Sequence, residues 1–111
     1  MRQASYNRVL LKVSGESLKG SGNYAFEPDA VNYLAQQIGD AHSMGVEIAV
    51  VIGGGNIWRG ASVEDQGMDR ATADYAGMLA TMINALALQD ALEKCGITTR
   101  TQSALQVQAV A

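Results

Sequence analysis

The sequence predicts an α/β fold with parallel strands, on the strength of two observations. Two apolar runs, 9–13 and 46–52, each end in a glycine-bearing loop. Between them, apolar residues recur at helical spacing over a stretch long enough for the crossover that parallel strands need. Ligands of such sheets bind beyond the carboxyl ends of the strands, so we expect the two loops to be neighbours and to form a binding site.

The flanking residues set the expected helix boundaries. Pro28 suits the first position of the crossover helix, and Gly45 provides its stop. A second helix is expected from an Asp69 cap to Lys94. Its apolar residues cover more than one stripe, so it is expected to bury two faces, the second against either another subunit or its own domain. Residues 97–102 predict a third, more polar strand.

The most informative residues are Gly53, Gly54 and Gly55, directly after the second strand. Backbone without side chains ahead of a helical turn lets several N–H groups point at one anion, which predicts a phosphate-binding loop. Lys12 stands alone in the apolar first strand, where its charge is costly to bury without a partner. We therefore expect Lys12 to point at whatever the glycines hold. The alternatives are a simple tight turn and an edge lysine that reaches water.

Composition excludes several classes of function. A net charge of −3 argues against nucleic-acid and anionic-membrane surfaces, whereas loop amides and a few basic residues suffice for nucleotides. The single cysteine, Cys95, excludes an internal disulfide and a multi-cysteine metal site, and His42 has no second histidine to bind a metal with. Neither a signal peptide nor a run of roughly 18 apolar residues is present, so we expect a cytoplasmic protein without a membrane span. P-loop, G-x-S-x-G and H-E-x-x-H motifs are also absent.

Two further features allow more than one interpretation. The polar, glycine-rich residues 19–25 formally match G-x-G-x-x-A, but that dinucleotide fingerprint belongs at the turn between strand and helix, so a flexible surface loop is favoured. Asp74 lies near the start of the long helix. Its spacing alone favours a first-turn carboxylate that stabilises the helix dipole.

Taken together, the lysine strand and the glycine triplet resemble the amino-acid kinase superfamily and, within it, the bacterial uridylate kinases. The match is carried by residues 11–16, 51–60, 67–68, 74–81, Asn84 and 90–92. The first two motifs are shared across the superfamily, whereas the Arg59-Gly60 ending and the block 74–81 are specific to the uridylate enzymes. The resemblance implies a three-layer α/β/α sandwich with a mainly parallel sheet.

The resemblance also implies an activity: transfer of the γ-phosphoryl group of ATP to UMP, giving UDP and ADP with Mg²⁺, in pyrimidine nucleotide biosynthesis. Lys12 would be the catalytic residue. ATP would be bound by Lys12, Val13, Ser14, Gly15, Gly55 and Arg59. UMP would be bound by Gly54 and, at its ribose, by Asp74. The family's GTP-activation segment matches Gly20, Ser21, Gly22, Asn23, Tyr24 and Ala25, and no residue is assigned to a metal.

Length is the departure from this family, whose members are about twice as long. Residues 1–111 correspond to the N-terminal, phosphate- and UMP-binding part, and the C-terminal nucleotide-binding half is absent, so we expect the isolated chain to be inactive. The resemblance further implies a cytoplasmic homo-oligomer, a hexamer, with GTP as activator. Two alternatives stay open: a carboxylate or carbamate kinase of the same superfamily, and a non-catalytic nucleotide-dependent storage protein of the same fold.

Overall fold

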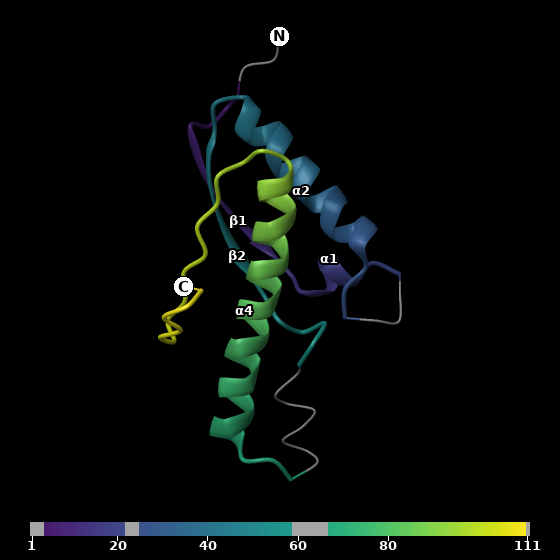
Figure 1. Cartoon of the computed structure of the whole chain (residues 1–111), viewed down its shortest axis with the longest axis vertical. Helices are drawn as coiled ribbons and strands as arrows, with labels where there is room; N and C mark the ends of the chain where they lie inside the picture. Colours follow the sequence, from purple (N-terminus) through teal and green to yellow (C-terminus); the bar gives the residue numbers. More distant parts are fainter. Residues whose placement is uncertain (1–3, 22–24, 59–66, 111) are drawn as a thin grey trace.

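The computed structural model describes residues 4–21, 25–58 and 67–110. The elements run in the order β1 (Arg8–Val13), α1 (Glu16–Lys19), α2 (Pro28–Ser43), β2 (Glu47–Ile52) and α4 (Arg70–Lys94). The strands β1 and β2 pair in parallel, as expected from the β-α-β pattern. Helices α2 and α4 pack against each other on one side of this sheet (Figure 1).

The helix boundaries follow the capping residues in the sequence. Pro28 occupies the first turn of α2, and Gly45 after its end has a φ of +86°, a conformation that favours glycine. At the start of α4, the Asp69 side chain accepts a hydrogen bond from the backbone N–H of Thr72 at 3.2 Å. Gly96, with a φ of +83°, follows the other end. Both predicted helices are confirmed, with their boundaries.

The core lies between the two long helices and one face of the sheet. In the parallel register Val9 pairs with Ile48, Leu11 with Val50 and Val13 with Ile52, so these side chains share one face. The β2 members of these pairs pack against a buried apolar cluster formed by Leu18, Val31, Ala35, Ile38, Leu88, Ala91 and Leu92. The short helix α1 supplies Leu18, which is fully buried. This packing fixes where β1 and β2 end relative to α4.

The opposite face of the sheet is uncovered. It carries Leu10 beside Ala49 and Lys12 beside Val51. Leu10 is 71% exposed and Val51 51% exposed, values that are unusual for apolar residues of a parallel strand. The described residues therefore provide the sheet and one helical layer of a three-layer sandwich.

Helix α4 extends well beyond the sheet (Figure 1). The radius of gyration is accordingly 15.3 Å, compared with about 13 Å for a compact domain of this length. Leu88 and Leu92 near its C-terminal end are buried in the core, whereas Tyr75, Leu79 and Ile83, four residues apart, are exposed. Among the described residues this second face of α4 packs against nothing, so its burial against another subunit stays a prediction.

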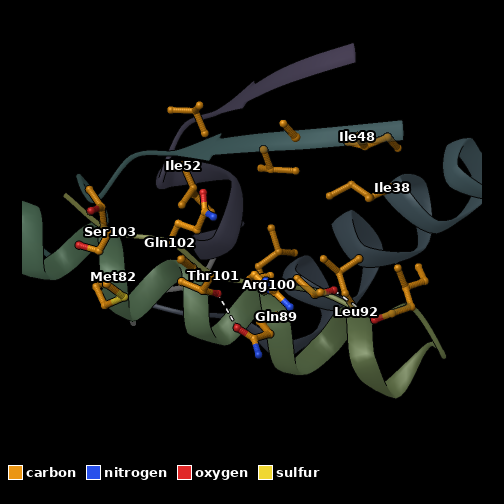
Figure 2. Close-up of a pocket in the computed structure, with 18 of the residues that line it drawn as sticks. Ile38, Ile48, Ile52, Met82, Gln89, Leu92, Arg100, Thr101, Gln102 and Ser103 are labelled. Carbon is orange, nitrogen blue, oxygen red and sulfur yellow. Dashed lines mark hydrogen bonds between the residues drawn. The ribbon is translucent and has the colours of Figure 1, made fainter. Parts of the chain in front are cut away.

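The predicted third strand at 97–102 is also wrong: these residues form no strand. They lie along α4 and face β2 across a cavity of about 900 Å³ (Figure 2). A side-chain hydrogen bond from Thr101 to Gln89 ties the segment to α4, and the Thr99 hydroxyl donates locally to the Ile97 carbonyl. Threonine and isoleucine favour a strand only where a neighbouring backbone is within reach, and β2 is not.

No helix in the described part of the chain combines the length and the apolarity that crossing a lipid bilayer requires.

Candidate functional site

The loops that follow β1 and β2 meet at the carboxyl end of the sheet, as the sequence predicts. The N–H of Gly53 donates to the Val13 carbonyl at 2.9 Å, which continues the strand pairing into the loops. Together the loops surround a hollow of about 320 Å³. Its lining residues are Lys12, Val13, Ser14, Gly15, Glu16, Val51, Ile52, Gly53 and Gly55. The hollow thus brings together most of the residues expected to bind ATP.

Close backbone contacts explain two of the glycines in these loops. A Cβ atom on Gly15 would overlap the side-chain oxygen of Asn56 and lie 2.9 Å from the backbone nitrogen of Gly55. A Cβ on Gly54 would lie 3.0 Å from both the Ala80 Cβ and the backbone nitrogen of Thr81. Neither glycine has a positive φ, so the requirement is for space and not for an unusual conformation. The glycine triplet is therefore packed closely between the first loop and α4, and its role in phosphate binding stays a prediction.

Three consecutive N–H groups in this loop have no acceptor. Within the described residues, the amides of Gly54, Gly55 and Asn56 donate to no protein group. The turn closes one step later, where the N–H groups of Ile57 and Trp58 donate to the Gly54 carbonyl at 3.0 and 2.9 Å. Successive unpaired amides form an anion-binding concavity. The arrangement suits the oxygens of a phosphate group.

Lys12 lies on the uncovered face of the sheet, beside Val51, where β1 ends. It is exposed and lines the same hollow as Gly53 and Gly55. Among the described residues no carboxylate forms an ion pair with its ammonium group. The alternative of a lysine that only reaches water accounts for its exposure, but not for its place beside the glycine triplet.

Two asparagines at this site were given no role from the sequence. Asn84 on α4 is fully buried, and its amide donates to the Gly53 carbonyl at 2.7 Å. It also exchanges hydrogen bonds with the side chain of Asn56, at 2.6 and 3.1 Å. A buried amide needs partners, and an asparagine within an apolar helical stretch is the signal that points to such a contact.

Asp74 lies outside the hollow. Helix α4 begins at Arg70, so Asp74 belongs to its second turn, and the first-turn interpretation is wrong. Its carboxylate is half-exposed and accepts from the Arg70 guanidinium at 3.1 Å. Trp58 links this end of α4 to the glycine loop, because its indole N–H donates to the Ala73 carbonyl at 2.8 Å.

The structure places only part of the remaining predicted site. Arg59 and residues 22–24 lie outside the described residues. Gly20 ends α1 with a φ of +61°, and Ser21 is exposed beside it. The Ala25 carbonyl accepts from the Asn56 side chain at 2.8 Å. The segment after α1 thus reaches the glycine loop at Ala25. The larger cavity shares only Val51 and Ile52 with the hollow and contains none of the glycine triplet, so it is not the candidate site.

Comparison with known proteins agrees with this geometry. The model of the Amino acid kinase family matches residues 7–109. The chain belongs to the amino acid kinase family. Curated relatives include the uridylate kinases of Xanthomonas axonopodis pv. citri and Xanthomonas campestris pv. campestris, each 53% identical over 110 residues. Those alignments cover 99% of this chain and 46% of the relative, so the chain spans about half the length of the curated relatives it matches.

Comparison with solved structures identifies the fold of this amino acid kinase chain. The crystal structure of UMP kinase from Ureaplasma parvum matches with a TM-score of 0.85 and 37% identity, over 99% of this chain and 46% of that one. The UMP kinase structure from Bacillus anthracis matches with a TM-score of 0.75 and 40% identity, over 84% of this chain and 37% of that one. The fold is therefore the three-layer amino-acid kinase sandwich, incomplete in this chain.

The packing of Gly54 against α4 can be tested with Gly54→Ala. The added methyl group must displace the loop from the backbone of α4, so we expect a loss of about 1–3 kcal/mol in the free energy of unfolding. Urea unfolding followed by the fluorescence of Trp58, the only tryptophan, measures it.

Gly39→Ala is the matched control. Its Cβ would meet only the end of the Ile97 side chain, at 3.0 Å, and alanine favours the helix by up to about 1 kcal/mol. We expect the Gly39 variant to be at least as stable as the original chain. Equal destabilisation by both variants would show that α4 does not confine Gly54.

Proposed function

We propose that this chain is the N-terminal half of a UMP kinase, which transfers the γ-phosphoryl group of ATP to UMP and gives UDP and ADP. The observation that carries the proposal is that Lys12 lines the same hollow as Gly53 and Gly55, within the loop where the amides of Gly54, Gly55 and Asn56 have no acceptor among the described residues. Similarity to uridylate kinases at 53% identity supports UMP as the acceptor.

The chemistry of phosphoryl transfer suits this site. A phosphate oxygen of UMP attacks the γ-phosphorus of ATP, and the bond to the β–γ bridging oxygen breaks as ADP leaves. Catalysis of such a transfer consists mainly of positioning and stabilisation of charge. We assign Lys12 to charge stabilisation, with Val13, Ser14, Gly15, Gly55 and Arg59 as further ATP contacts. Gly54 and Asp74 are assigned to UMP.

Mg²⁺ enters this proposal as part of the MgATP substrate. No cluster of three or more His, Cys, Asp or Glu residues able to hold a metal exists within the described residues. Mg²⁺ commonly keeps its waters and is held through substrate phosphates, with one or two carboxylates. We therefore place the ion on the ATP phosphates and assign it no ligand in this chain.

The remaining proposals concern assembly, regulation and location. The exposed row of Tyr75, Leu79 and Ile83 on α4 supports contact with a second subunit, in line with the hexamer that we propose. GTP activation is assigned to residues 20–25, which reach the glycine loop through Ala25. A single exposed cysteine agrees with a reducing cytoplasm, where pyrimidine nucleotide biosynthesis would use the enzyme.

An acceptor assay tests the activity. We define the completed chain as residues 1–111 followed by the C-terminal half of the uridylate kinase of Xanthomonas axonopodis pv. citri. The completed chain should phosphorylate UMP in preference to CMP, glutamate or carbamate, and the isolated 111 residues should not. Transfer to a carboxylate or carbamate would support the alternative kinases, and nucleotide binding without transfer would support a storage protein. UDP formation by the isolated chain, verified by mass, would show that its active site is not half absent.

Lys12→Ala tests the catalytic assignment in the completed chain. Removal of a preorganised cation should lower kcat by roughly 10²–10³ and leave UMP binding almost unchanged, because the lysine acts mainly on the transition state. Steady-state kinetics give both quantities. Lys94→Ala is the control, since Lys94 pairs with Asp90 at the far end of α4 and should not affect turnover. Unchanged kcat in the Lys12 variant would remove this residue from the mechanism.

Asp74→Asn tests the proposed ribose contact. A carboxylate that accepts from ribose hydroxyls binds ground and transition states about equally, so the KM for UMP should rise while ATP affinity is retained. Asp90→Asn is a matched control, because both aspartates lie on α4 and pair with a basic residue four positions away. Equal weakening of both nucleotides would contradict a specific contact with UMP.

A further inference from the structure

Asn84 occupies an unfavourable place for a polar residue. It lies on α4 at 0% exposure, between the buried apolar residues Met82 and Leu88. Burial of an amide without partners is costly, so its hydrogen bonds decide whether the position is tolerated. Its nitrogen donates to the Gly53 carbonyl and to the Asn56 side-chain oxygen, and its oxygen accepts from Asn56 in return. Every polar atom of this side chain is therefore committed to the glycine loop.

Asn56 carries these contacts to two other segments. Its nitrogen donates to the Ala25 carbonyl at 2.8 Å, and its oxygen occupies the space that a side chain on Gly15 would fill. The two facing amides thus connect α4, the glycine triplet, the first loop and the segment after α1. No other pair of side chains in the described residues joins so many parts of the site.

The Asn84 bond to Gly53 also determines the direction of an amide that faces the ligand. The Gly53 carbonyl and the Gly54 N–H belong to one planar trans peptide, so they point in opposite directions. When Asn84 holds the carbonyl toward α4, the Gly54 N–H must point away from α4. Glycine has the least restricted backbone dihedral angles, so without the Asn84 hydrogen bond the peptide between Gly53 and Gly54 could flip.

We propose that the Asn56–Asn84 amide pair sets the orientation of the Gly54 N–H group, which makes Asn84 a positioning residue for the phosphate that this amide binds. It acts from behind the loop and touches no substrate. The inference rests on the proposed function for the identity of the ligand, the nucleoside monophosphate UMP, to which Gly54 is assigned. The hydrogen bonds between Asn84, Asn56 and Gly53 do not depend on that function.

The test compares Asn84→Ala with Ile38→Val in the completed chain. Ile38 is buried in the same core but lies on α2, away from the glycine loop. Loss of the Gly53 contact should weaken UMP binding by about tenfold and lower kcat by at least as much, because the Gly54 amide no longer meets the acceptor phosphate. The Ile38 variant should be less stable and yet keep both values. UMP titration, steady-state kinetics and urea unfolding measure the three quantities.

A second variant separates positioning from simple loss of packing. Asn84→Asp keeps the shape, but an ionised carboxylate cannot donate to the Gly53 carbonyl. The protonated form can, and burial raises the pKa of the introduced carboxyl above the usual aspartate value. Relative to the original protein at the same pH, UMP affinity should therefore recover as the pH falls from about 9 to about 6. The Ile38 variant should show no such recovery.

The outcomes distinguish this inference from the proposed function. If the completed chain phosphorylates UMP and the Asn84 and Ile38 variants behave alike, the inference is wrong and the function stands. If UMP is not phosphorylated but the Asn84 variants still weaken UMP binding, the function is wrong and the positioning role stands. Should Asn84→Ala not fold, Asn56→Ala replaces it in the same comparison, and affinity equal to that of the Ile38 variant would overturn the proposal.

Discussion

Direct contact between backbones is the constraint on which the site depends. The first loop approaches the glycine triplet at Gly15, and the triplet approaches α4 at Gly54, with no room for a Cβ at either place. Because the loops touch, the ends of β1 and β2 are brought close enough to share one hollow. Because Asn84 on α4 holds the Gly53 carbonyl, the N–H group of Gly54 points away from α4. A side chain at either glycine would push these layers apart before it affected any ligand.

The two faces of the sheet divide structural and chemical roles between them. One face packs Ile48, Val50 and Ile52 against the helices, and the other presents Lys12 beside an uncovered apolar surface. The candidate site therefore opens on the side of the sheet that the described residues leave uncovered. The relatives are about twice as long as this chain.

Local signals in the sequence predicted the helices, the parallel pair and the meeting of the two glycine-bearing loops. Pro28 and Asp69 mark helix starts through the backbone conformation or cap that they provide, and the glycine triplet needs only its own backbone. The strand predicted at 97–102 is absent, because a strand depends on a neighbouring backbone within reach, which local signals do not reveal. Asp74 was placed in the first turn of α4, although the Asp69 cap already implies that Asp74 lies in the second turn, four residues after Arg70. The role of Asn84 could not be predicted from the sequence, because it depends on which segment packs against α4.

The alternation of side chains in the paired strands β1 and β2 limits which insertions and deletions β1 can accept. Side chains alternate between faces along a strand, so insertion or deletion of one residue within β1 would exchange the two sets. Lys12 would turn toward the packed helices and be stripped of water, while Leu11 would take its place outside. The alternation of side chains that forms the core therefore also determines which face of the sheet carries the Lys12 ammonium group. A change in the length of β1 would therefore disturb both the packing of the core and the position of Lys12.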